Sequence, residues 1–116
     1  MKYVVGQQGE VRVIKIDAIT HTTKPYMDKS PSGAWIISHS EKGHHHVVGG
    51  NCEVLERTSN VPAGMRILYA IVSTPDSLRQ EASTPHDAIR LPPGIYEMRI
   101  SREYDPFMEQ TRQVAD

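Results

Sequence analysis

The chain has 116 residues, of which 38% are hydrophobic, and its formal net charge at pH 7 is −1. This length fits one domain, 1–116, with a modest core. The balanced charge excludes nucleic-acid binding by phosphate neutralisation, which needs a basic face. No segment approaches the roughly 20 apolar residues of a membrane-spanning helix, and the single cysteine, Cys52, is compatible with a reducing compartment. We therefore expect a cytoplasmic domain that binds neither nucleic acid nor membrane.

Short apolar and β-branched runs between turn residues predict an all-β domain, a small barrel or sandwich of mostly antiparallel strands. Eight glycines and eight prolines fit such a turn-rich fold. The nearly continuous apolar run 65–74 predicts the central strand, whereas 21–34 is expected to be a long irregular connection. In chain order, the expected strands are 3–5, 10–17, 35–39, 44–48, 51–56, 65–74, 77–82 and 94–104.

Two further patterns lie near the C-terminus. Residues 94–104 alternate in polarity, with Tyr96 and Met98 on one face and Glu97 and Arg99 on the other, which predicts a half-buried strand. Asp105-Pro106 has the residue types of an N-cap followed by a first helical position. A short C-terminal helix is therefore expected over 107–114.

The stretch 35–48 is predicted to be a β-hairpin that turns near Lys42-Gly43, and it carries four of the six histidines. Side chains alternate along a strand, so His44 and His46 share one face. An even number of loop residues places His39 on that face too, opposite His46 or His44. A three-residue loop instead places His39 beside His45, so the cluster depends on the length of the loop.

Imidazoles on opposed strand positions lie close enough to converge on one metal ion. We expect a divalent transition metal (Zn, Fe, Ni or Cu), because all four accept imidazole ligands. The function predicted is metal binding, with metal-assisted catalysis on a small molecule as one form of it. Glu41 and Glu53 are the candidate proton acceptors. The expected ligands are His39, His44, His46 and His86, the last from the segment before a rigid Pro-Pro-Gly turn.

Two other functions fit the same residues. The histidines are structural if the chain is a non-catalytic interaction or assembly module, with exposed strand edges serving a possible homo-oligomer. Clustered histidines also titrate near neutrality, so a pH-responsive module is a further interpretation. Cys52 is expected in the core in each case, since a free cysteine behaves as a small hydrophobic residue. The alternatives stay open on the sequence alone.

The order of the motifs resembles a group of small uncharacterised bacterial and phage-type proteins. These have a GHxH element, here Gly43 to His46, then a histidine before LPPG-x-Y, here Leu91 to Tyr96, and a closing REY segment, here Arg102 to Tyr104. The resemblance implies that His44 and His46 act together with His86, and it implies no reaction.

A looser resemblance is to the cupins, whose first motif joins HxH to a downstream glutamate. His44-x-His46 matches that motif, but Glu53 comes later than in a cupin. His86 precedes the Pro-Gly turn, whereas a cupin histidine follows it. A β-barrel with an internal site is what this resemblance implies.

Overall fold

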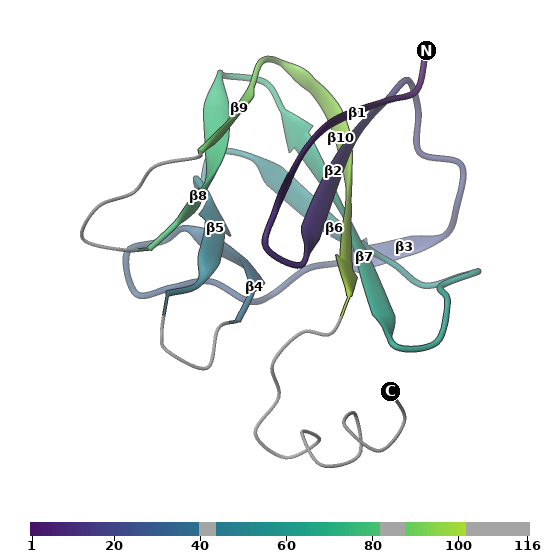
Figure 1. Ribbon diagram of the computed structural model, residues 1–116, viewed down its shortest axis with the longest axis horizontal. Coiled ribbons are helices and arrows are strands. Elements are labelled where there is room, and N and C mark those ends of the chain that lie inside the picture. The colour runs from purple at the N-terminus through teal and green to yellow at the C-terminus, as the bar shows by residue number, and fades with distance from the viewer. Residues whose placement is uncertain (40–43, 82–87, 102–116) are drawn as a thin grey trace.

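The computed structural model describes residues 1–39, 44–81 and 88–101, which form two antiparallel β-sheets packed face to face (Figure 1). The larger sheet has the order β1-β2-β10-β7-β6-β3 and the smaller one β4-β5-β8-β9. These strands do not close into a barrel, so the all-β prediction is confirmed in its sandwich form. The strands are β1 (Tyr3–Gln8), β2 (Val11–Ile16), β3 (Thr23–Pro25), β4 (Trp35–Ser38), β5 (His46–Val48), β6 (Glu53–Arg57), β7 (Met65–Val72), β8 (Asp76–Gln80), β9 (Ile89–Leu91) and β10 (Gly94–Ser101).

The predicted central strand is confirmed, because β7 pairs with β10 on one side and with β6 on the other. Two three-residue strands were not predicted. β3 lies at an edge, inside the connection expected to be irregular, and β9 pairs with β8 at the edge of the small sheet. The helix expected over 107–114 lies outside the described residues. Within the described part of the chain, no helix is long and apolar enough to cross a membrane.

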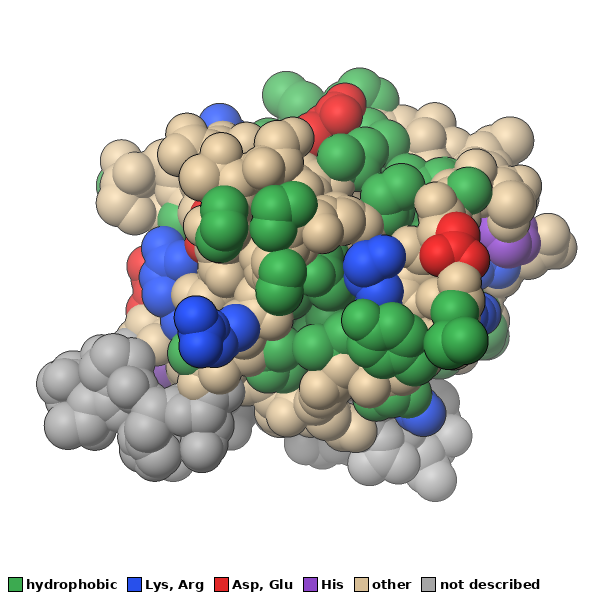
Figure 2. All heavy atoms as spheres, turned by 90° about the horizontal axis from the view of Figure 1, so that it is seen from above, with side chains coloured by type: hydrophobic (Ala, Val, Ile, Leu, Met, Phe, Trp, Pro, Cys, Tyr) green, Lys and Arg blue, Asp and Glu red, His purple; other side chains and the backbone are tan. Residues whose placement is uncertain are grey.

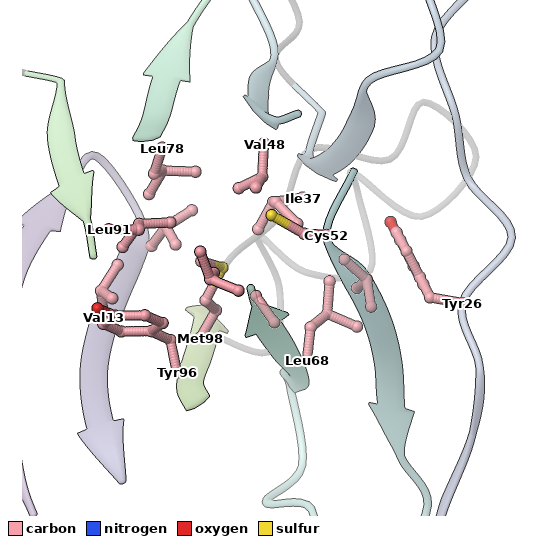
Figure 3. Packing of buried hydrophobic residues seen from close by; sticks show 14 of the residues in the cluster. Val13, Tyr26, Ile37, Val48, Cys52, Leu68, Leu78, Leu91, Tyr96 and Met98 are labelled. Atoms are coloured by element: carbon pink, nitrogen blue, oxygen red, sulfur yellow. The ribbon is translucent and has the colours of Figure 1, made fainter. Parts of the chain in front are cut away.

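The main core lies between the two sheets, as Figure 3 shows. Leu68 and Met98 reach into it from the large sheet, and Ile37 and Leu78 reach into it from the small one; none of the four is exposed. Cys52 points into the same core and is 4% exposed, which confirms its predicted position. Burial, together with the nearby Asp76 carboxylate, raises the pKa of the Cys52 thiol to about 11.

The opposite face of the large sheet carries a second, smaller cluster of buried side chains, Ile14, Ile16, Ile67 and Tyr69. The loop residues Ile19 and Val61 pack against this cluster. The alternation predicted in β10 is confirmed, since Tyr96 and Met98 enter the main core. The opposite face of β10, which carries Glu97, is nevertheless not fully open to solvent, because Glu97 is only 4% exposed.

Candidate functional site

The histidine-bearing hairpin is confirmed, since β4 and β5 pair antiparallel. Its first pairs, beginning with Trp35 opposite Val48, follow one register. Extended to the tip, that register places His39 opposite His44, which is one of the two predicted pairings. The base of the hairpin thus follows one of the registers that the sequence left open.

The register shifts by one residue between Ile36 and Ser38, so that Ser38 faces His46. The extra residue on β4 is a β-bulge, and a shift of one residue exchanges the two faces of a strand. His39 consequently meets His45, with the ring centroids 4.8 Å apart and the rings at 73°. The predicted pairing of His39 with His44 or His46 is wrong for this reason.

Two side chains from outside the hairpin bind the bulge. The Tyr26 hydroxyl donates a hydrogen bond to the Ile36 carbonyl at 2.5 Å, and Arg66 Nη2 donates to the Ile37 carbonyl at 2.7 Å. Arg66 Nη1 also donates to the Tyr26 hydroxyl oxygen at 2.8 Å, so the two groups act as a unit. Ile37 itself is fully buried in the core. The bulge thus depends on contacts made by the connection before β4 and by β7.

His46 points between the sheets and is 4% exposed. Its Nδ1 lies 2.7 Å from the Gln8 side-chain oxygen, and Gln8 in turn donates to the Leu78 carbonyl at 3.2 Å. Its Nε2 lies 3.6 Å from a Glu10 carboxylate oxygen, and the Ser38 hydroxyl donates to the other Glu10 oxygen. These contacts tie the turn between β1 and β2 to the small sheet, which is a structural role.

The contacts of Glu10 with His46 and Ser38 keep its carboxylate ionised. Burial raises the pKa of Glu10, but hydrogen bonds from His46 and Ser38 outweigh burial and lower the pKa to about 2. The neighbouring Gly9 has a φ of 56°, and a Cβ atom there would lie 3.0 Å from His46 Nε2. A glycine is therefore required at this turn, both for its backbone angle and for the close approach of the ring.

A second group forms on the other side of the hairpin. His39 Nε2 lies 2.5 Å from Asp28 Oδ2, and the His45 ring meets the edge of the His39 ring. Asp28 is held in place because its backbone carbonyl accepts a hydrogen bond from the Ile36 amide at 2.9 Å. The His39 and Asp28 side chains are 38% and 40% exposed, so solvent ions reach this group.

The remaining predicted site residues are dispersed or lie outside the described residues. His44 is exposed, and its carbonyl accepts a hydrogen bond from the Gln80 side chain at 3.2 Å. Glu53 is exposed in β6 of the other sheet. Glu41 and His86 lie outside the described residues. No group of three or more His, Cys, Asp or Glu side chains is arranged to hold a metal ion in the part of the chain that the structure describes.

Three residues next to the histidines were missed from the sequence: Gln8, Glu10 and Asp28. Gln8 and Glu10 precede the hairpin by about thirty residues, and no spacing rule connects them to it. Asp28 is the single acidic residue in 21–34, and this was the only feature of the sequence that could have pointed to it as a partner of a histidine. All three reach the histidines through the packing of the sheets, which a one-dimensional pattern does not contain.

These features define a small antiparallel β-sandwich with a histidine-bearing hairpin at one end of its smaller sheet. Residues 7–101 match a family model described as a domain of unknown function, DUF8820, and the chain belongs to this family. No curated protein and no solved structure matches the chain.

Proposed function

We propose that the chain is a metal-binding β-sandwich protein in which His39 and His45 bind one divalent transition metal. The observation that carries the proposal is the pair of adjacent imidazoles, 4.8 Å apart, with Asp28 on the outer nitrogen of His39. Histidines that ligate a metal usually donate their second ring nitrogen to a carboxylate, which fixes the tautomer and the ring orientation. Asp28 supplies that contact to Nε2 of His39.

Further ligands would come from segments that adjoin this pair. The Glu81 amide donates to the His45 carbonyl at 2.8 Å, so the segment that carries His86 starts beside His45. His44 precedes His45 in the sequence, and Glu41 belongs to the segment that joins β4 to β5. Two imidazoles with one or two of these groups would form an open site for Zn, Fe, Ni or Cu. Such a site would supply Lewis-acid chemistry to a small-molecule substrate.

Metal analysis of untagged protein tests the proposal. We expect a stoichiometric transition metal, and a melting temperature that rises with added Zn²⁺ and falls with a chelator, because a ligand that binds only the folded state stabilises it. His39→Ala and His45→Ala should each abolish the metal. His21→Ala is the matched control, since His21 lies in the connection between β2 and β3 and should retain it.

His46→Ala separates this proposal from the sequence prediction. Here we expect a less stable protein that still binds the metal, because the buried His46 contacts Gln8 and Glu10. Loss of the metal from His46→Ala, with retention in His45→Ala, would contradict the ligand assignment. A protein with no stoichiometric metal and no response to Zn²⁺ or chelator would refute metal binding.

That negative result would favour the second candidate, an interaction or assembly module with structural histidines. A specific observation supports it. Of the four exposed large hydrophobic residues among those that the structure describes, Tyr3 and Val4 begin the edge strand β1 and Met1 precedes it. Seen from above, the side on which the N-terminus lies in Figure 1, hydrophobic side chains are spread over the surface among charged ones (Figure 2). Exposed apolar edge strands are common sites of strand addition by a partner.

A further inference from the structure

A pocket of about 360 Å³ opens on the face of the large sheet that points away from the small sheet. Its floor includes Ile16 and Tyr69, which belong to the second cluster of buried side chains. Its charged wall is formed by Arg57 at the end of β6 and by Glu97 and Arg99 of β10. This volume is within the range of pockets that hold small organic molecules, which begins at about 300 Å³.

The wall contains two guanidinium groups for one buried carboxylate. Glu97 is 4% exposed, and its two oxygens lie 2.7 Å from Arg99 Nε and 3.8 Å from Arg57 Nη1. Arg57 also donates to the carbonyls of Ser59 and Asn60, each at 2.8 Å, and is 8% exposed. Buried charges are retained where they are paired. The single Glu97 carboxylate is therefore paired with two guanidinium groups, those of Arg57 and Arg99. The three side chains together carry a net charge of +1.

Arg99 is the cation best placed to meet a ligand. Its side chain is 33% exposed, and within the described part of the chain its terminal nitrogens Nη1 and Nη2 make no hydrogen bond. The Glu97 contact through Nε holds the guanidinium plane in place. Lys2 lines the same pocket, whereas the remaining acidic group, Asp17, is paired with the Met1 amino group. The planar fork of an arginine matches a carboxylate, with two parallel hydrogen bonds.

We propose that this pocket binds a small organic carboxylate. Its anionic group would lie against Arg99 and Lys2, and its apolar body would lie over Ile16 and the Tyr69 ring. Glu97 serves as a positioning residue that orients Arg99 and is not itself a contact of the ligand. The site lies on the other side of the large sheet from the histidine hairpin, so this inference does not depend on metal binding.

Titration of ¹⁵N-labelled protein with benzoate tests the proposal, with the neutral isostere benzamide as the matched ligand. We expect saturable shifts of the amide signals of Ile16, Tyr69 and Glu97 with benzoate alone. Arg99→Gln should weaken benzoate binding by at least about tenfold, because a charge-assisted hydrogen bond is lost. Arg90→Gln is the matched control, since Arg90 is exposed in β9 and does not line the pocket.

Arg99→Gln removes one partner of the buried Glu97, so this variant could fail to fold. A second variant tests the pocket without changing that ion pair. Ala18 is exposed and lines the pocket, so Ala18→Trp should fill it and abolish the benzoate shifts while the melting temperature stays unchanged. Three results would overturn the proposal. These are no saturable shift with benzoate, equal shifts with benzamide, or equal weakening by Arg90→Gln and Arg99→Gln.

Discussion

Replacing the Tyr26 hydroxyl should weaken the bulge that decides which histidines meet. In Tyr26→Phe, the Ile36 carbonyl loses a donor at 2.5 Å, and Arg66 Nη1 loses an acceptor at 2.8 Å. Tyr26 is 5% exposed, so water does not readily replace either partner. Without these contacts the bulge is less stable. The register that places His39 opposite His44 then becomes more favourable relative to the bulged one.

The size of the effect follows from the two groups that lose a partner. A buried polar group without its partner costs about 1–3 kcal/mol, and more when it is charged. We therefore expect Tyr26→Phe to lower the free energy of unfolding by about 3 kcal/mol, which is on the order of 15 °C in melting temperature for a domain of this size. Tyr96→Phe is the matched control. Tyr96 is also buried and donates one hydrogen bond, to the Pro92 carbonyl at 2.6 Å, so about 1 kcal/mol is expected.

Urea unfolding followed by fluorescence measures both variants, because the single tryptophan, Trp35, lies in β4 itself. Nuclear Overhauser contacts between the His39 and His45 rings report the register. They should weaken in Tyr26→Phe and persist in Tyr96→Phe. Equal destabilisation by the two substitutions, with the His39–His45 contacts unchanged, would refute the role assigned to Tyr26.

Two further predictions concern single ionisable groups. Contacts in the folded state lower the pKa of Glu10 from 4.5 to about 2, so its contribution of about 3 kcal/mol is complete above pH 4.5 and is lost as the pH falls toward 2. Urea unfolding at pH 3 and pH 6 should show a smaller difference in Glu10→Gln than in the wild type, and an identical difference would contradict this account. The pKa of Cys52 is about 11 in the folded protein, so a disulfide reagent at pH 8 should label Cys52 at least about a hundredfold faster in urea than in buffer. Similar rates in the two conditions would show that the thiol is accessible in the folded state.

Much of the fold was predictable because local patterns persist in the folded chain. The apolar run in β7 predicted a central strand, since only a strand with neighbours on both sides buries so continuous a run. The alternation in β10 predicted which of its side chains enter the core. The three-residue strands β3 and β9 carry too few residues for any period to be visible.

The pocket on the large sheet was likewise only partly predictable from the sequence. Glu97 and Arg99 were predicted on the polar face of β10, and they are there. Their burial and their pairing with Arg57 depend on β6 and on the loops that cover the sheet. A polarity pattern identifies the face of a strand, but it does not show what covers that face.

By itself, the sequence determined the all-β class, the central strand, the buried Cys52 and a hairpin with four histidines at one end. Only the tertiary structure decided which histidines meet. Tyr26 and Arg66 reach the hairpin from other parts of the chain and stabilise one extra residue in β4. Because strand faces alternate at every residue, that single bulge in β4 moves His39 to the face of His45, whereas His46 keeps the buried face that it shares with Val48 of β5.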